Sequence, residues 1–213
     1  MLPGRVVCSS CKTFLEYNCF DSYMVRCKVC SYPLLDYVYS CKRCKELPGI
    51  RIVSLFDYRN AKIRHILESY KFRGMKKYSR LFAFILSDYL KKNGLSDSVL
   101  VPVPCSSTSF KRRGWDHMRE IAGVLERRYG FRVCELLKNR EVSSEEQKFL
   151  GLESRIKSSE SRFAVKEKSV DCGQRIIILD DICTTGMTLK SCSTVLEEAG
   201  YRKIMALTVF AEL

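Results

Sequence analysis

The sequence predicts an α/β protein whose mostly parallel, twisted sheet is flanked by helices and preceded by a small cysteine-rich module. Two observations predict this fold. After the first 48 residues, apolar runs of strand length alternate with segments of helical periodicity, which is typical of a parallel sheet. Before that point, six cysteines form three Cys-x-x-Cys pairs, which is typical of a small module held together by metal.

Composition narrows the possible functions. The chain has 213 residues and is 46% hydrophobic, enough for one sizeable core and a small appendage. Its net charge of +13 favours polyanionic partners, namely nucleic acid, phosphorylated small molecules or an anionic membrane surface. No apolar run approaches the ~20 residues that a membrane span needs, and residues 1–8 contain no signal-peptide core. We therefore expect a soluble, cytoplasmic protein.

The expected elements follow from periodicity and from breaker residues. Residues 46–49 contain Pro48 and Gly49 and mark a boundary, so that the expected domains are residues 1–48 and 49–213. The pattern predicts helices over residues 59–72, 81–90, 116–128 and 188–199. It predicts strands over residues 98–104, 131–137, 175–179 and 203–209.

The cysteine pairs indicate tetrahedral zinc. Two Cys-x-x-Cys turns can supply the four thiolates of a closed site, and the preferred pairing combines the two turns farther along the chain, Cys27, Cys30, Cys41 and Cys44. Cys8 and Cys11 then form a possible second site with Cys19 as a third ligand, or bind no metal; in the alternative arrangement they pair with Cys27 and Cys30. Because so short a module buries little apolar surface, we expect the zinc to be structural. Iron and a redox role for one pair are the minor alternatives.

The most informative segment is residues 176–189. Four large apolar residues predict a buried strand, Asp180 and Asp181 follow it, and a short Thr/Gly loop leads into a helix. Carboxylates are acceptors for the vicinal hydroxyls of a ribose, and the loop offers backbone N–H groups and hydroxyls to a phosphate. Glycine allows close backbone approach, and the helix directs its positive end at the anion. The residues expected to hold the phosphate are Thr184, Thr185, Gly186 and Thr188.

This segment resembles the 5-phosphoribosyl-1-pyrophosphate (PRPP) motif of the type I phosphoribosyltransferases. In such an enzyme the ligand's pyrophosphate leaves C1 of the ribose, normally with Mg²⁺ bridging pyrophosphate and ribose oxygens. The loop after residues 101–104 is the expected pyrophosphate site, with Ser106 and Ser107 as neutral donors and Arg112 and Arg113 as cations. The alternative for these cations is a solvated, charged loop end.

A second basic segment, residues 71–78, interleaves cations with aromatic residues. This combination can follow a nucleic-acid backbone and stack bases, or it can be a solvated turn whose aromatic residues enter the core. The nucleic-acid candidates are Lys71, Arg73, Lys76 and Lys77, together with Trp115, for which packing of its loop onto the body is the alternative. His117 is expected to be a capping or hydrogen-bonded residue of a first helical turn, and no catalytic residue is assigned.

Several segments together resemble the ComF family of competence proteins. They are the cysteine pairs, residues 70–72, 101–104 and 113–115, the Gln147, Leu150 and Arg155 segment, Phe163, and residues 180–188. The resemblance implies a type I phosphoribosyltransferase-like fold with an amino-terminal zinc ribbon, often double, and a role in handling single-stranded DNA during natural transformation. The chain departs from the family at Asp116 and His117, where Asn and Gln are usual.

Three functional hypotheses follow. The first, which we favour, is a DNA-processing protein that binds PRPP or a related phosphoribosyl ligand and single-stranded DNA. The second is an active Mg²⁺-dependent phosphoribosyltransferase whose acceptor the sequence does not identify. The third is a metal-stabilised adaptor for a DNA helicase or recombination protein. The metals implied are structural Zn²⁺ and the Mg²⁺ that accompanies PRPP.

Overall fold

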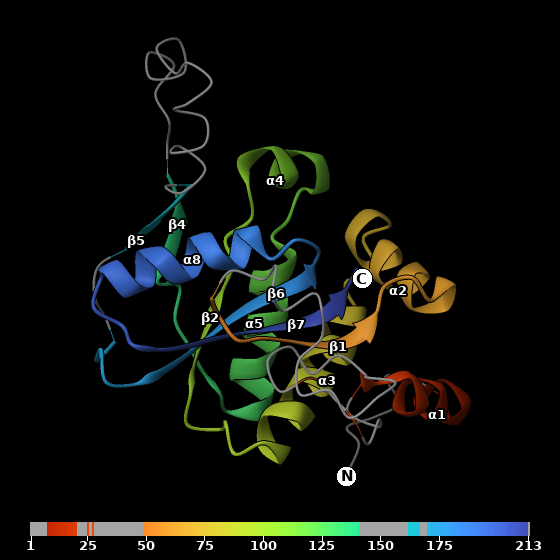
Figure 1. Ribbon diagram of the computed structural model, residues 1–213. Coiled ribbons are helices and arrows are strands. Elements are labelled where there is room, and N and C mark those ends of the chain that lie inside the picture. The colour runs from red at the N-terminus through yellow and green to blue at the C-terminus, as the bar shows by residue number, and fades with distance from the viewer. Residues whose placement is uncertain are drawn as a thin grey trace.

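The computed structural model describes residues 8–20, 25, 27, 49–140, 162–166 and 170–212. Its centre is a five-stranded sheet in the order β1-β7-β6-β2-β3, in which every neighbouring pair is parallel (Figure 1). The strands are β1 (Ile52–Asp57), β2 (Val99–Pro102), β3 (Arg132–Val133), β6 (Arg175–Cys183) and β7 (Lys203–Ala211). A separate antiparallel pair joins β4 (Leu137–Asn139) to β5 (Phe163–Val165). The prediction of a mostly parallel sheet flanked by helices is confirmed.

Helices cover both faces of the sheet (Figure 1). One face carries α2 (Ala61–Phe72), α3 (Tyr78–Lys92) and α5 (His117–Tyr129), and the other carries α8 (Met187–Glu198). Two shorter helices, α1 (Ser9–Asn18) and α4 (Ser107–Arg113), complete the described elements. No helix among the described residues is long and apolar enough to cross a membrane.

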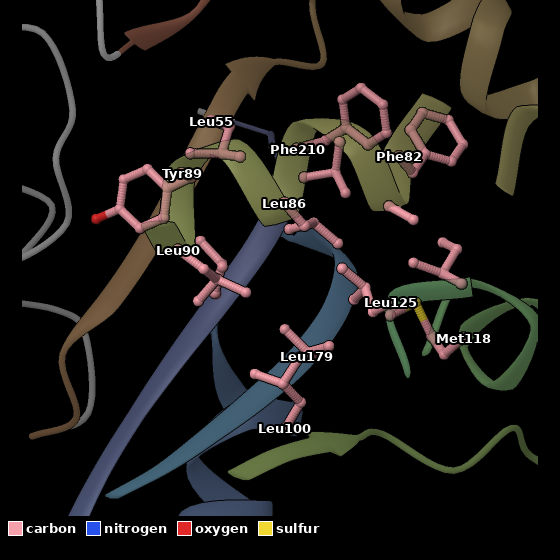
Figure 2. Packing of buried hydrophobic residues seen from close by; sticks show 14 of the residues in the cluster. Leu55, Phe82, Leu86, Tyr89, Leu90, Leu100, Met118, Leu125, Leu179 and Phe210 are labelled. Carbon is pink, nitrogen blue, oxygen red and sulfur yellow. The ribbon is translucent and has the colours of Figure 1, made fainter. Parts of the chain in front are cut away.

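Two apolar clusters hold these layers together, and β6 contributes to both. Ile177 and Leu179 pack with α2, α3 and α5, whereas Ile176 and Ile178 pack with α8. Figure 2 shows the first cluster, where side chains of α3 and α5 such as Leu86 and Leu125 converge with those of the strands. This alternation over residues 176–179 is the period of two expected of a strand buried on both sides.

The expected helices are present with small shifts at their ends, but three strand predictions need correction. The predicted strand over residues 131–137 is wrong as a single element, because the chain leaves the sheet after Cys134 donates to the Leu100 carbonyl (2.9 Å) and then pairs with β5. Strand β1 was not predicted, although it is buried over most of its length. Strand β6 continues to Cys183, so the two acids lie within the strand and not after it.

The amino-terminal module is described only in part. Cys8 and Cys11 are exposed at the start of α1, where the sequence predicted a tight turn. Cys27 is buried, while Cys30, Cys41 and Cys44 lie outside the described residues, as do Gln147, Leu150 and Arg155. The preferred four-cysteine site and the domain boundary at residue 48 therefore stay predictions.

Candidate ribose-phosphate site

The two acids of the site lie next to each other near the end of β6, and each brings one carboxylate oxygen within 4.8 Å of the other and of a ring nitrogen of His117. Asp181 contacts Lys71 of α2 and His117 of α5. Burial, followed by the charge of Asp180, raises the pKa of the Cys192 thiol, so the charge of Asp180 also acts on α8. The adjacent acids therefore have different surroundings, although the sequence presents them as a pair.

Asp181 is buried and contacts two basic side chains. Its side chain is 4% exposed, and its Oδ2 lies 2.8 Å from Nζ of Lys71 and in contact with Nε2 of His117. Lys71 belongs to the last turn of α2, and His117 is the first residue of α5. A carboxylate buried without such partners would carry a large desolvation penalty, so these contacts make the ionised form compatible with its position.

Local structure fixes the helix ends that carry Lys71 and His117. Asp116 caps α5, since its Oδ1 accepts from the N–H groups of Met118 and Arg119, both at 3.0 Å. The hydroxyl of Tyr70, which is fully buried, donates to the His117 carbonyl at 2.7 Å and thereby joins α2 to α5. Trp115 packs edge-on against Tyr70, with ring centroids 4.8 Å apart. His117 thus lies in the first turn of α5, as the sequence predicts, but the hydrogen bond is made by its carbonyl, and its ring nitrogens are buried with no hydrogen-bond partner among the described residues.

The electrostatics separate the two carboxylates. Burial, followed by the negative charge of Asp181, raises the pKa of Asp180 to about 7. Burial would also raise the pKa of Asp181, but Lys71 and then His117 outweigh it and hold that pKa below its usual range. Asp181 is consequently a permanent anion, whereas Asp180 changes charge near neutral pH. The Oδ1 of Asp180 also accepts the Asp181 backbone N–H at 2.9 Å.

The phosphate loop follows directly from β6. Thr184 and Thr185 are exposed, Thr188 is partly buried, and Gly186 stands at the N-cap of α8 with φ of 75°. That left-handed conformation favours glycine, and glycine brings no capping side chain to the first turn of the helix. The Met187 N–H donates to the Thr185 hydroxyl at 3.4 Å. The loop therefore combines hydroxyls with the positive end of a 12-residue helix.

The expected pyrophosphate loop is held in place by neighbouring side chains. Asp116 Oδ2 accepts the Cys105 N–H (3.3 Å), and the amide of Asn139 donates to the Cys105 carbonyl (2.7 Å). Ser106 caps α4 by accepting the Ser109 N–H at 3.2 Å, and Ser107 is exposed in the first turn. The sequence did not predict these roles for Asn139 and Asp116. Their shared partner is the backbone of Cys105, which lies well before both residues in the chain.

The two arginines of α4 have different surroundings. Arg113 donates to the Cys105 sulfur at 3.1 Å and lowers the pKa of Asp180, so it lies near the acids. Its Nε is buried and has no hydrogen-bond partner among the described residues. Arg112 is exposed instead, with its guanidinium 5.2 Å from the centre of the Phe72 ring. Of the two predicted cations, Arg113 is the one brought to the acids.

The nucleic-acid candidates are divided between the surface and the interior. Arg73, Lys76 and Lys77 are exposed, whereas the side chain of Lys71 is 16% exposed and paired with Asp181. Trp115 is 9% exposed, which supports the packing alternative and leaves little ring surface for a base. Lys76 lies over the Trp115 ring at 5.5 Å. We call the exposed group of Phe72, Arg73, Lys76 and Arg112 the basic–aromatic patch.

The described residues offer two places to consider for metal. Cys8 hydrogen-bonds with Ser10 at 3.1 Å, and this contact, followed by contacts with Cys11, lowers the pKa of Cys8 to about 7. The pKa of Cys11 is raised, first by its hydrogen bond with Cys8, so only Cys8 is the readily ionised thiol that suits zinc. The second place is beside the acids, where His117, Asp180 and Asp181 each bring one possible ligand atom within 4.8 Å of the others. There Lys71 already supplies the positive charge, so these residues do not form a dedicated metal cage.

Comparison with known proteins places the chain among competence proteins. It is 31% identical over 161 residues to competence protein ComFC of Streptococcus pneumoniae (strain ATCC BAA-255 / R6), covering 76% of this chain and 68% of that protein. It is 29% identical over 208 residues to competence protein ComFC of Bacillus subtilis (strain 168), covering 93% and 80%. No protein-family model matches the chain. Adenine phosphoribosyltransferase from Leishmania tarentolae is a distant structural neighbour, with a TM-score of 0.37, 12% identity, and coverage of 75% of this chain and 91% of that chain.

The raised pKa of Asp180 predicts a pH-dependent stability that Asp180→Asn removes. The folded protein binds this proton more tightly than the unfolded chain, so wild type loses stability as the pH rises from about 4 through about 7. Relative to wild type, Asp180→Asn should gain stability over this range, by on the order of 2–4 kcal/mol. Urea unfolding of both proteins at pH 4.5 and pH 7.5 measures the difference. An equal difference at the two pH values would contradict the assignment.

Proposed function

The chain belongs to the ComF family of competence proteins, and we propose that it acts in DNA uptake by binding PRPP, or a related ribose phosphate, together with single-stranded DNA. The observation that supports the ligand best is that the acids of β6, the turn at Gly186 and the start of α8 follow one another directly in the chain. Acceptors for ribose hydroxyls and donors for a phosphate stand a few residues apart on rigid elements. A ribose 5-phosphate has hydroxyls that can donate to the acids and a phosphate that can accept from the loop.

Within this proposal each end of the ligand has its own partners. The 5-phosphate binds the hydroxyls of Thr184, Thr185 and Thr188 and the N–H groups of the first turn of α8. Asp180, the more exposed acid, accepts from a ribose hydroxyl, and Asp181 contributes its negative charge from beneath. The diphosphate of PRPP lies toward the Ser106 loop and Arg113. Mg²⁺ would bind together with the diphosphate and keep several waters, because Lys71 already pairs with Asp181, one of the possible protein ligands.

Zinc is proposed for the amino-terminal module. Cys8, whose pKa is lowered, and the neighbouring Cys11 are exposed at the start of α1 and are described residues that fit it. Bound zinc would supply folding energy to a segment with little core of its own.

Mutating Asp180 should weaken PRPP binding. Asp180→Asn keeps the shape of the side chain but removes the ionised acceptor, so we expect calorimetric affinity for PRPP with Mg²⁺ to fall about tenfold or more. Wild-type affinity should also rise between pH 6 and pH 8, because Asp180 becomes ionised over this range.

The matched control is Asp97→Asn, which makes the same substitution at an exposed acid remote from the loop and should bind as wild type does. Equal binding by wild type and Asp180→Asn would refute the proposed site. Consumption of PRPP during the titration would favour the transferase alternative.

The basic–aromatic patch supports single-stranded DNA as the second ligand. Phe72 is 56% exposed, which leaves part of its ring accessible to a base. Arg112 stacks on Phe72, and Arg73 and Lys76 add exposed positive charge next to it. Aromatic rings for bases beside cations for phosphates are the usual elements of a single-strand site.

The two kinds of contact predict different salt dependence. Arg73→Gln with Lys76→Gln should weaken binding of an oligothymidine and reduce the slope of log K against log salt by about 0.7 per lost phosphate contact. Phe72→Ala should weaken binding by about 1–3 kcal/mol while leaving the slope unchanged, because it removes stacking and not charge. Fluorescence anisotropy at several salt concentrations measures both effects.

The control is Arg175→Gln with Lys203→Gln, which removes the same two charges at the amino-terminal ends of β6 and β7. A loss of affinity as large as that of the patch variant would indicate diffuse charge attraction and would contradict a defined patch.

A further inference from the structure

Lys71 lies outside the basic–aromatic patch, and the proposed binding of ribose hydroxyls by the acids does not explain why it is buried beside them. It was expected to contact DNA, yet it turns inward, where its Nζ lies 2.8 Å from Oδ2 of Asp181. It also lowers the pKa of Asp180, so its charge reaches both acids. An ammonium group has three protons to donate, and the contact with Asp181 uses one of them. The remaining donors and a side-chain exposure of 16% leave Lys71 able to contact a ligand in the site.

We infer that Lys71, held by Asp181, is a binding residue for the diphosphate of PRPP, an inference that rests on the proposed ribose-phosphate site. The 5-phosphate belongs to the α8 end, so the anionic group left for a cation near the acids is the diphosphate at C1. C1 adjoins the hydroxyl-bearing C2, which places the diphosphate beside whatever holds the hydroxyls. The ammonium of Lys71 is in that position.

A second cation lies on the same side. Arg113 also lowers the pKa of Asp180, and its Nε is buried without a hydrogen-bond partner among the described residues. A buried guanidinium donor left unpaired is costly, and a diphosphate oxygen would satisfy it. Lys71 from α2 and Arg113 from α4 therefore form a pair of cations contributed by separate elements.

Asp181 acts here as a positioning residue. Burial of its carboxylate at 4% exposure and contact with His117 restrain it, and it in turn restrains the flexible lysine. A lysine fixed before the ligand arrives loses less side-chain entropy on binding, which preserves affinity.

The test compares PRPP with ribose 5-phosphate, which lacks the diphosphate. Lys71→Met should weaken calorimetric binding of PRPP with Mg²⁺ about tenfold or more while changing ribose 5-phosphate affinity little. Lys71→Arg keeps the charge and should recover much of the PRPP affinity. Oligothymidine binding should be unchanged by Lys71→Met, in contrast to the Arg73 and Lys76 variant.

Lys71→Met leaves the Asp181 charge buried without its ammonium and can unfold the protein. Lys71→Met with Asp181→Asn removes both charges, and its comparison with Asp181→Asn alone isolates Lys71 in proteins that lack the buried anion. The loss should again appear for PRPP and not for ribose 5-phosphate.

The outcomes separate this inference from the proposed function. Equal weakening of both ligands by loss of Lys71, or of neither, would overturn the inference while the ribose-phosphate site stands. Failure of folded wild type to bind either ligand would overturn the proposed site and this inference together. A loss of DNA binding equal to that of the patch variant would return Lys71 to the DNA surface.

Discussion

The arrangement of the site depends on one buried carboxylate and the basic groups that contact it. Asp181 lies in the middle of the molecule on β6, where an unpaired charge would be strongly unfavourable. Lys71 and His117 meet it there, and both come from the ends of helices that pack on the same face of the sheet. The cap of α5 by Asp116 and the Tyr70 hydrogen bond fix those ends. The charge of Asp181 thus connects β6 to α2 and α5 through its contacts with Lys71 and His117.

The electrostatic surroundings of the two acids give them different functions. Asp181 contacts Lys71 and stays ionised, while burial and the charge of Asp181 make Asp180 titrate near neutral pH. One acid organises cations, and the other is the more exposed acceptor beside the phosphate loop. Adjacent carboxylates in similar surroundings would share a proton and repel each other. Here Lys71 and His117 contact Asp181, and the charge of Asp181 contributes to the raised pKa of Asp180.

The sequence predicts what is local and misses what depends on tertiary contact. The Thr/Gly loop and the helix after it were predicted, because apolar periodicity and a glycine turn are encoded within 14 consecutive residues (176–189). Strand β1 was missed, since no motif followed its short apolar run, which is interrupted by Ser54, whereas the run of β6 led into the two acids and the Thr/Gly loop. Lys71 was assigned to DNA because its neighbours are basic and aromatic, and nothing local shows that it reaches Asp181. His117 was correctly expected in a first helical turn, but its partner was not identifiable.

A crystal structure of the protein with PRPP and Mg²⁺ tests the central claim most directly. The account predicts the 5-phosphate at Thr184, Thr185 and Thr188 and the first turn of α8, with a ribose hydroxyl on Asp180 and the diphosphate next to Lys71 and Arg113. A ligand bound elsewhere, or a reversed ligand with the diphosphate on the α8 loop, would contradict it.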